Sequence, residues 1–429
     1  MNKVSTKDLF KIWSYVAANS FGGPAGQIAV IHQLVVEDKK LISEKRFLHA
    51  LNFCMLLPGP EAQQLATYMG WLMAKWRGGV IAGGLFILPG FLSILLLSYL
   101  YAYFNNNEIV QGLFYGIKPA IIAIVLSALY RISKKSLNTI FYKLIAAIAF
   151  CALYFFQISF PVVVLTSGLV GIFFGKYVNN DIPLEDTDSS SPNTFDTLKT
   201  FLIWIFIWFF PILITVLVFG EQSNLHKLNI FFSKMSLVTF GGAYAALSYV
   251  AQQGVEVYGW LQGAEMLDGL ALAETTPGPL IQVVQYVGFM ASFRFPGTLA
   301  PGFSAFLGSI LTTWMTFAPC FLFIFTLGPY IEFIRGKKIF SDALATISAS
   351  VVGVIFNLSI WFVVNSLFQK SKEIKYGILQ FKVPVLYSLD LIALLICIIA
   401  LVMQFKFKSS VIKIIGVSII LGILGTYLK

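Results

Sequence analysis

Hydrophobic residues gather along this chain into nine long blocks separated by polar residues. The blocks are Val80–Phe104, Ile109–Ile132, Leu137–Phe156, Phe160–Val178, Thr200–Gly220, Phe303–Ile334, Ile339–Phe368, Val383–Phe405 and Ser410–Leu428. Each holds about 20 residues or more, and a helix rising ~1.5 Å per residue needs about 20 residues to cross ~30 Å of hydrocarbon. The pattern predicts an all-α integral membrane protein with about nine full crossings, placed in the plasma membrane as a multi-pass protein.

Composition supports this prediction. Hydrophobic residues make up 58% of the 429 residues and charged residues 12%, against roughly 45–50% and about 25% in soluble domains. The net charge of +10 comes from lysines and arginines that fall mostly at the ends of the predicted helices, where such residues set membrane topology. We therefore expect the lipid bilayer as a partner, and no nucleic acid.

Cysteine and histidine spacing gives no sign of a metal site. The four cysteines are isolated within apolar stretches, and the three histidines form no HExxH pattern or other cluster. Paired spacings typical of zinc or redox sites are absent from the sequence. We expect neither a metal nor a cofactor.

Two glycine motifs occur twice in the chain at one constant displacement. Ser20-Phe21-Gly22-Gly23 recurs as Thr239-Phe240-Gly241-Gly242, and Pro58-Gly59-Pro60 recurs as Pro277-Gly278-Pro279; 240 − 21 and 277 − 58 both give 219. Gln63 falls on Gln282 at the same displacement. Chance could supply one short match, but two in register indicate a duplication.

The duplication divides the chain into four segments. Residues 1–178 form a first transporter repeat, 179–199 an acidic cytoplasmic linker, 200–220 an extra linking transmembrane helix, and 221–429 a second repeat. The extra helix has no counterpart before the first repeat. If the first repeat crosses the membrane an even number of times, the second enters from the opposite side, which is the inverted-repeat plan of many secondary transporters.

The distribution of basic residues predicts that some segments enter the membrane and return. In the first half lysines and arginines mark three connections, which the positive-inside rule places in the cytoplasm. Leu9–Val36 and Phe47–Ala74 cannot then each cross once, and each has a glycine- and proline-rich break near its middle. We interpret both as re-entrant hairpins of two half-helices. Four lysines at positions 370, 372, 375 and 382 disagree, since this topology places their loop outside.

Breaks of this kind suit an anion-binding site. A helix that starts after a break points its free N–H groups and partial positive charge into the gap, and glycine allows close backbone approach. The candidate substrate-binding residues are Phe21, Gly22, Gly23, Gln27, Pro58, Gly59, Pro60, Gln63, Gln64, Phe240, Gly241, Gly242, Thr276, Pro277, Gly278, Pro279, Gln282 and Lys118. The alternative is that the breaks are only kinks packed against neighbouring helices. The presence of two copies of the motif makes this alternative less attractive than a single copy would.

Charged residues close to the breaks are the second group of candidates. Glu61 and Glu274 flank the two Pro-Gly-Pro motifs, and a carboxylate within a membrane is a candidate for function. Either residue could carry a proton coupled to anion movement, or could cap a half-helix. Lys118 lies in the middle of an apolar block and is a candidate cation for the substrate.

The motifs resemble the chromate ion transporter family in its long, two-domain form. The similar stretches are FGGPAGQIA at Phe21–Ala29, LLPGPEAQQLATYMGW at Leu56–Trp71 and LAETTPGPLIQVVQYVGF at Leu272–Phe289. The resemblance covers nearly the whole chain. It implies secondary transport of an oxyanion, chromate export above all, with sulfate as a structural analogue.

Other functions remain open on the sequence alone. An anion channel could use the same half-helices, and the transported species could be another inorganic or organic anion. A membrane enzyme would need a nucleophile, base or metal cluster, and a primary pump would need a nucleotide-binding motif; the sequence contains neither. The coupling ion, the direction of transport and the oligomeric state, for which a homodimer is one candidate, stay undetermined.

Overall fold

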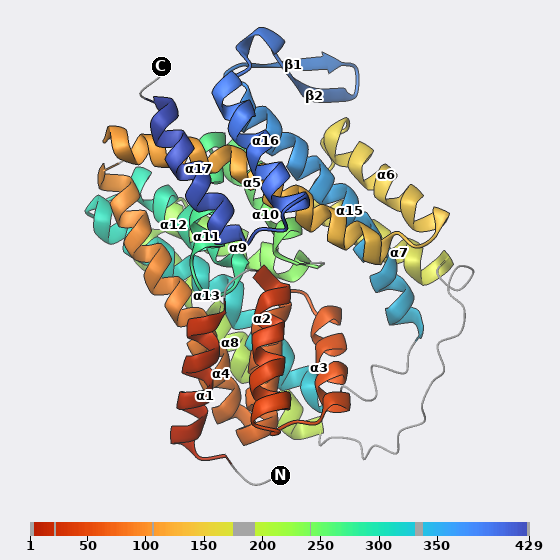
Figure 1. Cartoon of the computed structure of the whole chain (residues 1–429). Helices are drawn as coiled ribbons and strands as arrows, with labels where there is room; N and C mark the ends of the chain where they lie inside the picture. Colours follow the sequence, from red (N-terminus) through yellow and green to blue (C-terminus); the bar gives the residue numbers. More distant parts are fainter. Residues whose placement is uncertain are drawn as a thin grey trace. The chain divides into compact units, whose positions relative to one another are not determined.

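The computed structural model describes residues 4–20, 23–104, 107–174, 194–240, 242–330 and 338–426, with only the backbone of Ala25 and residues 338–341. The first-half helices are α1 (Thr6–Asn19), α2 (Gly23–His32), π-helical η1 (Gln33–Asp38), α3 (Glu44–Leu56), α4 (Glu61–Phe104), α5 (Glu108–Ser136), α6 (Ile140–Tyr154) and α7 (Phe160–Phe174). Then follow α8 (Thr194–Phe219), α9 (Asn224–Val238), α10 (Ala243–Ala251), π-helical η3 (Gln252–Val257), α11 (Gly263–Thr275), η4 (Leu280–Gln282), α12 (Val283–Arg294), α13 (Pro301–Leu327), η5 (Gly328–Tyr330), α15 (Lys338–Leu367), strands β1 (Ser371–Tyr376) and β2 (Leu379–Pro384), η6 (Leu386–Ser388), α16 (Leu391–Phe405) and α17 (Val411–Thr426) (Figure 1).

Five described helices are long and apolar enough to cross a membrane. They are Glu61–Phe104, Glu108–Ser136, Thr194–Phe219, Pro301–Tyr330 and Asp342–Leu367. The expectation of an all-α membrane protein is therefore confirmed, apart from the two-stranded hairpin β1–β2. Helix α8 starts at Thr194, inside the segment assigned to the linker, while residues 179–193 lie outside the described part of the chain.

Helices α6, α7, α16 and α17 are shorter than the apolar blocks that predicted them. They have 15, 15, 15 and 16 residues, and α7 and α17 end where the described residues end. The expected start at Val383 is wrong for α16, because Val383 belongs to β2. Asp390 instead caps the helix, and its carboxylate accepts hydrogen bonds from the N–H groups of Ile392 and Ala393. A hydrophobic window alone does not locate that cap.

Helix α4 consists of two helical segments joined at a sharp turn. Ala74 has φ −149° and ψ 34°, and Lys75 has φ 54° and ψ −145°, so neither residue is helical. The segment from Glu61 to this turn is short, and the remainder is a long apolar helix. The counterpart in the second half is α12, which a connection at residues 295–300 separates from α13.

Four interruptions separate short helices in the chain. They are the residues between α1 and α2, Leu57–Pro60 between α3 and α4, Thr239–Gly242 between α9 and α10, and Thr276–Pro279 between α11 and η4. The short elements keep the spacing of the sequence motifs: α3 and α11 differ by 219 at both ends (263 − 44 and 275 − 56), as do η1 and η3 (252 − 33 and 257 − 38). Local geometry and motif spacing therefore agree.

The described helices form two compact units that do not follow the two halves of the sequence. Unit 1 comprises residues 1–98, 181–243 and 276–340, and unit 2 comprises residues 99–180, 244–275 and 341–429. Each unit takes helices from both halves. All four interruptions belong to unit 1.

Glycines allow the closest backbone approaches in unit 1. Gly70 and Gly78 face each other across the turn within α4, and a Cβ on either would overlap the carbonyl oxygen of the other. Gly288 and Gly308 repeat this contact between α12 and α13, where a Cβ on Gly288 would lie 2.7 Å from the Gly308 carbonyl oxygen. Such small-residue contacts are a common way for membrane helices to pack.

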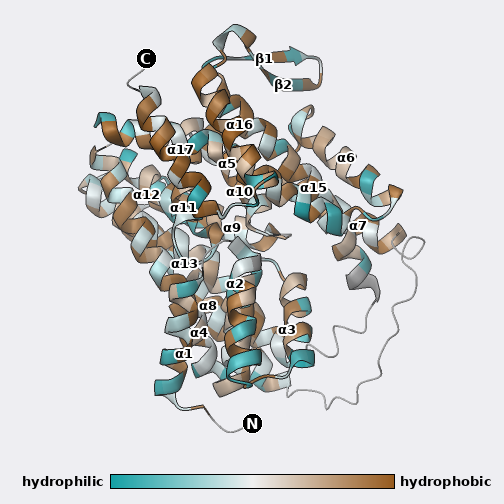
Figure 2. Ribbon diagram, viewed as in Figure 1, coloured by the Kyte–Doolittle hydropathy of each residue, from teal (hydrophilic) through white to brown (hydrophobic). Residues whose placement is uncertain are grey.

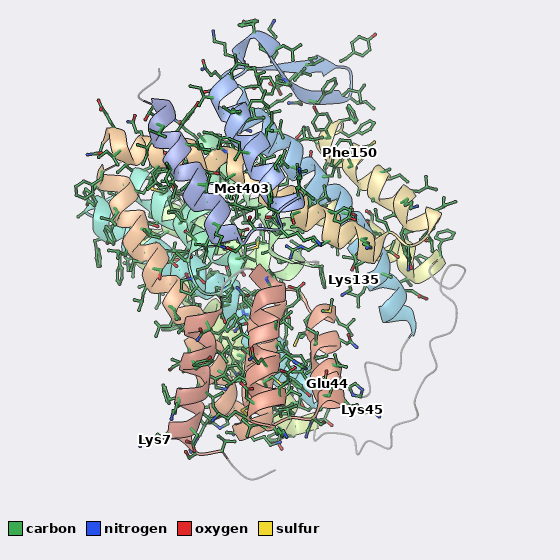
Figure 3. All side chains as sticks on the ribbon, in the orientation of Figure 1. Lys7, Glu44, Lys45, Lys135, Phe150 and Met403 are labelled. Atoms are coloured by element: carbon green, nitrogen blue, oxygen red, sulfur yellow. The ribbon has the colours of Figure 1, made fainter. Side chains whose placement is uncertain are left out.

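Unit 2 is built around helix α5, which packs on α16, α17 and α11. Its core includes Ala120, Ala123, Ala400 and Ile414, with Met403 against them (Figure 3). Hydrophobic residues dominate α16 and α17 (Figure 2). The faces of these helices that are not buried in the unit are therefore suited to lipid.

We predict that Gly70→Ala destabilises the protein by about 1–3 kcal/mol, the usual cost of overpacking. The added methyl group would overlap the backbone of Gly78, so the turn must open. Thermal unfolding in detergent measures the effect. Gly84→Ala in the same helix is the control, since nothing lies within 4 Å of its added Cβ. Equal unfolding temperatures for the two variants would contradict the described packing.

Candidate functional site

The first Pro-Gly-Pro break lies between α3 and α4. Gly59 has φ +127°, a conformation that side chains other than glycine rarely adopt. Its N–H donates a hydrogen bond of 2.7 Å to the carbonyl oxygen of Thr239. A Cβ on Gly59 would lie 2.9 Å from Cys320 Sγ and 2.7 Å from Gln64 Nε2. Glycine at this position is therefore required by both backbone conformation and space.

The second Pro-Gly-Pro break has the same construction. Gly278 has φ +101°, and its N–H donates a 3.0 Å hydrogen bond to the Ser20 carbonyl oxygen. Its own carbonyl oxygen accepts a 2.6 Å hydrogen bond from Gln27 Nε2. A Cβ here would meet the backbone of Gly90 on α4 at 3.3 Å. Cys320 and Gly90 each follow a helix proline, Pro319 and Pro89.

The two breaks are reciprocal. Each Pro-Gly-Pro glycine donates to the residue that opens the FGG motif of the other half, Thr239 for Gly59 and Ser20 for Gly278. The displacement of 219 residues relates both donors (278 − 59) and both acceptors (239 − 20). The four interruptions therefore meet in two pairs within unit 1, and each pair takes one interruption from each half of the chain.

Buried glutamines surround the breaks. Gln63, Gln64 and Gln282 are 0%, 0% and 1% exposed. Gln64 Nε2 donates to the Pro58 carbonyl oxygen at 2.7 Å, and Gln63 Nε2 donates to Thr67 Oγ1 at 3.0 Å. Gln282 Nε2 donates to Gln285 Oε1 at 2.8 Å and to Thr313 Oγ1 at 3.2 Å.

These contacts change the role expected for the glutamines. In the described part of the chain, the Oε1 atoms of Gln63, Gln64 and Gln282 have no hydrogen-bond partner. Both N–H groups of Gln282 Nε2, and one N–H group of Gln64 Nε2, already donate hydrogen bonds within the protein. In this arrangement the side chains position the breaks, and the donors that remain for an anion are mainly backbone N–H groups in the first turns of the following helices.

Glu61 begins α4 directly after the first break. A Cβ on Gly242 would lie 3.6 and 3.9 Å from the two carboxylate oxygens of Glu61, so the carboxylate faces the backbone of a break from the other half. Gly242 has φ +95° and Gly23, its counterpart, has φ +74°. A negative charge in the first turn of a helix is favourable. The position fits either a cap or a proton carrier.

Glu274 and Lys118 lie in unit 2, where each has a buried polar partner. The Tyr244 hydroxyl donates a 2.6 Å hydrogen bond to Glu274 Oε1. Lys118 Nζ lies 3.3 Å from Asp268 Oδ2, and that oxygen also accepts a 2.9 Å hydrogen bond from the Tyr101 hydroxyl. Lys118 is thus engaged in an ion pair, which the sequence reasoning did not anticipate.

Asp268 is the clearest functional candidate that the sequence reasoning missed. Its side chain is 3% exposed, and within the described residues its Oδ1 atom has no hydrogen-bond partner. The signal was available, because Asp268 is an acidic residue in the same short helix, α11, as Glu274. Acidic residues at such positions are functional candidates by the same argument.

The other predicted residues lie at the breaks or outside the described chain. Phe21, Gly22 and Gly241 are outside the described residues. Pro60, Thr276 and Pro279 are buried, while Pro58, Pro277 and Phe240 are half-buried. Among the residues that the structure describes, no group of three or more His, Cys, Asp or Glu side chains could hold a metal ion.

Comparison with known proteins identifies the family. A sequence model of the chromate transporter family matches residues 7–172 and 226–425. An uncharacterised transporter of Methanocaldococcus jannaschii is 24% identical over 426 residues, 99% of this chain and 95% of that protein.

Two further relatives are named for chromate. The chromate transport protein of Pseudomonas aeruginosa is 32% identical over 343 residues, 78% of this chain and 76% of that protein. The chromate transport protein of Cupriavidus metallidurans is 25% identical over 315 residues, 73% of this chain and 71% of that protein. No solved structure matches the chain. Because the family model matches most of the chain, this multi-pass protein of the cell membrane belongs to the chromate transporter family.

Proposed function

We propose that the protein is a secondary transporter of an oxyanion, chromate in the first place, and that the anion binds at the helix breaks of unit 1. The observation that carries this proposal is the reciprocal pair of hydrogen bonds, Gly59 to Thr239 and Gly278 to Ser20. They join the four breaks in two pairs, and helices starting from such breaks offer free N–H groups to an anion. We choose chromate as the substrate because two of the relatives are named as chromate transport proteins.

The same proposal includes two inverted repeats with re-entrant hairpins. Three observations support it: the common displacement of the short elements, the matching π-helical segments η1 and η3, and the paired glycine contacts. Helix α1 starts near Lys7, and helix α3 starts at Glu44 and Lys45. These two starts lie at the same end of the two helices (Figure 3). Helices α1 and α3 thus run in the same direction, as two in-and-out hairpins require.

Topology follows from the repeat plan: nine full crossings, with the N-terminus and acidic linker in the cytoplasm and Lys429 outside. Within unit 2, three connections that this plan places outside touch one another. Gln380 N–H donates to the Phe155 carbonyl oxygen at 2.8 Å, and Lys382 Nζ lies 2.7 Å from Glu256 Oε1. These contacts support one common side for the hairpin, the α6–α7 loop and η3.

Alternating access at the breaks, with sulfate as an analogue of chromate, completes the proposal. Export of a dianion across ~100 mV, inside negative, releases roughly 4.6 kcal/mol, twice the ~2.3 kcal/mol per charge. Export therefore needs little coupling, whereas uptake would have to overcome the same amount. An anion channel is the alternative. Measured turnover would indicate a transporter, whereas a single-channel current would indicate a channel.

We expect Gly59→Ala and Gly278→Ala to abolish most transport. A positive φ strains an alanine by about 1–3 kcal/mol, and the methyl group would press on Cys320 or Gly90, so chromate or sulfate flux into proteoliposomes should fall roughly tenfold or more. Gly84→Ala is the matched control. Parental flux in both glycine variants would mean that the anion binds elsewhere.

Glu61→Gln and Glu274→Gln test proton coupling. An amide keeps the shape of the carboxyl group but cannot carry a proton, so a proton-carrying residue should lose flux driven by a pH gradient while anion binding persists. A residue that only caps or positions a helix should instead lower the unfolding temperature. Tyr244→Phe, which removes the hydroxyl that donates to Glu274, serves as the control for packing at that position.

Single cysteines in a cysteine-free background test topology. Gln157→Cys, Glu256→Cys and Lys375→Cys should react with an impermeant maleimide added outside intact cells, and Asp8→Cys should react only after the membrane is opened. Labelling of Asp8→Cys and Lys375→Cys from the same side would contradict the proposed arrangement.

A further inference from the structure

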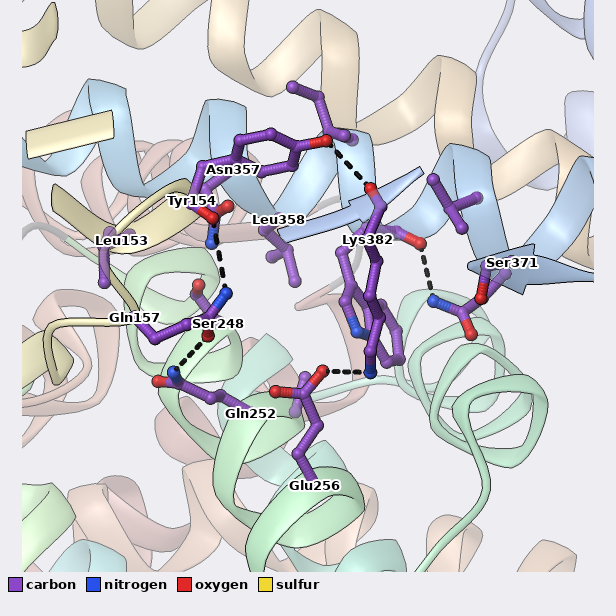
Figure 4. A pocket seen from close by; sticks show the side chains of 15 residues that line it. Leu153, Tyr154, Gln157, Ser248, Gln252, Glu256, Asn357, Leu358, Ser371 and Lys382 are labelled. Carbon is purple, nitrogen blue, oxygen red and sulfur yellow. Dashed lines mark hydrogen bonds and ion pairs between the residues drawn. The ribbon is translucent and has the colours of Figure 1, made fainter. Parts of the chain in front are cut away.

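Unit 2 contains a polar pocket that is lined only by residues of that unit. It has a volume of about 100 Å³, and a single water needs roughly 10–15 Å³ measured in this way. Its walls come from the end of α6, from α10 and η3, from α15, and from the hairpin β1–β2 (Figure 4). There is room for a small polyatomic ion with several waters.

The hairpin that covers this pocket is an addition to the repeat plan. The first half joins α5 to α6 through residues 137–139 alone, whereas the second half joins α15 to α16 through β1, β2 and η6. The Tyr154 hydroxyl donates a 2.9 Å hydrogen bond to the Lys382 carbonyl oxygen, and Gln157 Nε2 donates to the Gln380 carbonyl oxygen at 3.1 Å. These hydrogen bonds hold the hairpin over the pocket. The first half has no corresponding hairpin, because residues 137–139 alone connect its α5 and α6.

Neutral hydrogen-bonding side chains provide most of the polar lining. Gln157 from the α6–α7 loop, Ser248 from α10, Gln252 from η3 and Asn357 from α15 line it (Figure 4). Gln252 Nε2 donates to Gln157 Oε1 over a long 3.4 Å, so this contact is easily replaced by a ligand. Amides and hydroxyls can surround an anion without adding charge.

The charge of the pocket is set by one lysine and one glutamate. Lys382 Nζ lies 2.7 Å from Glu256 Oε1, with the side chains 46% and 26% exposed. An ammonium group has three donors, so Lys382 can bind a second acceptor. The hairpin region also carries Lys370, Lys372 and Lys375, and clustered positive charge concentrates anions near a site.

We propose that this pocket is a second binding site for a small oxyanion. Lys382 supplies the cation, amides and hydroxyls supply further donors, and Glu256 competes with the anion for Lys382. The inference rests on the proposed transport of an oxyanion, and gives that substrate a second binding position, in unit 2. Glu256 would keep the affinity low enough for the anion to leave again.

Two substitutions at the ion pair should change affinity in opposite directions. Lys382→Met removes the cation, and radiolabelled sulfate should bind roughly tenfold more weakly, because hydrogen bonds to charged groups are the strong ones. Glu256→Gln removes the competitor, and sulfate should bind several-fold more tightly. Lys372→Met is the control, with the same loss of charge on the same hairpin. Binding is measured in detergent at constant ionic strength.

The opposite signs separate this site from a structural latch. If the ion pair only fastens the hairpin, both variants lower the unfolding temperature. Sulfate binding then stays unchanged in both variants, or changes in the same direction in both. Either result overturns the inference. An equal loss of sulfate binding in Lys372→Met would also overturn it, because the positive charge of the hairpin as a whole would then explain the binding.

The Gly59→Ala background distinguishes the two sites. There, transport should be lost while sulfate binding that depends on Lys382 persists. Sulfate binding in that background that is insensitive to Lys382→Met would count against the site in unit 2, and leave the proposed site at the breaks of unit 1 unaffected. Parental transport by Gly59→Ala would count against the site at the breaks of unit 1, whatever the pocket variants do.

Discussion

The constraint on which this structure depends is that backbone N–H and C=O groups within a membrane must find partners inside the protein. Unbroken helices meet it by themselves, but four interruptions in unit 1 do not. Two of the donors that lack a partner within their own helix, Gly59 N–H and Gly278 N–H, bond to the carbonyl oxygens of Thr239 and Ser20 in the opposite half. Each break is thus completed by a break from the other half, which ties distant parts of the sequence into one unit.

This constraint also limits what the breaks can offer to a substrate. The two glycine N–H groups are already used, and Gln64 and Gln282 spend amide donors on holding the breaks. An anion bound at the breaks, as we propose, would therefore use the next N–H groups, in the first turns of the helices that follow. Glu61 stands in one of these turns, so that anion and carboxylate would compete for the same positive end of the helix.

Sequence reasoning located the breaks but not their partners. Glycine and proline report local backbone conformation, so the positive φ at Gly59 and Gly278 could be inferred from the motifs. The contacts with Cys320 and Gly90 join residues far apart in the chain, and no local pattern reports them. The hairpin was missed because its second strand, with its apolar positions, reads as the start of the next helix.

Lys118 was predicted as a cation for the substrate, and the structure shows it paired with a carboxylate of the protein. A lysine in the middle of an apolar helix needs a counter-charge, and Asp268 supplies it at 3.3 Å while Tyr101 donates to the same oxygen. While Asp268 is ionised, Lys118 is neutralised and has little attraction for a dianion. An oxyanion could replace Asp268 at Lys118 only if the carboxylate gained a proton or moved away. If Lys118 meets the substrate, anion binding and proton binding at this pair are therefore linked.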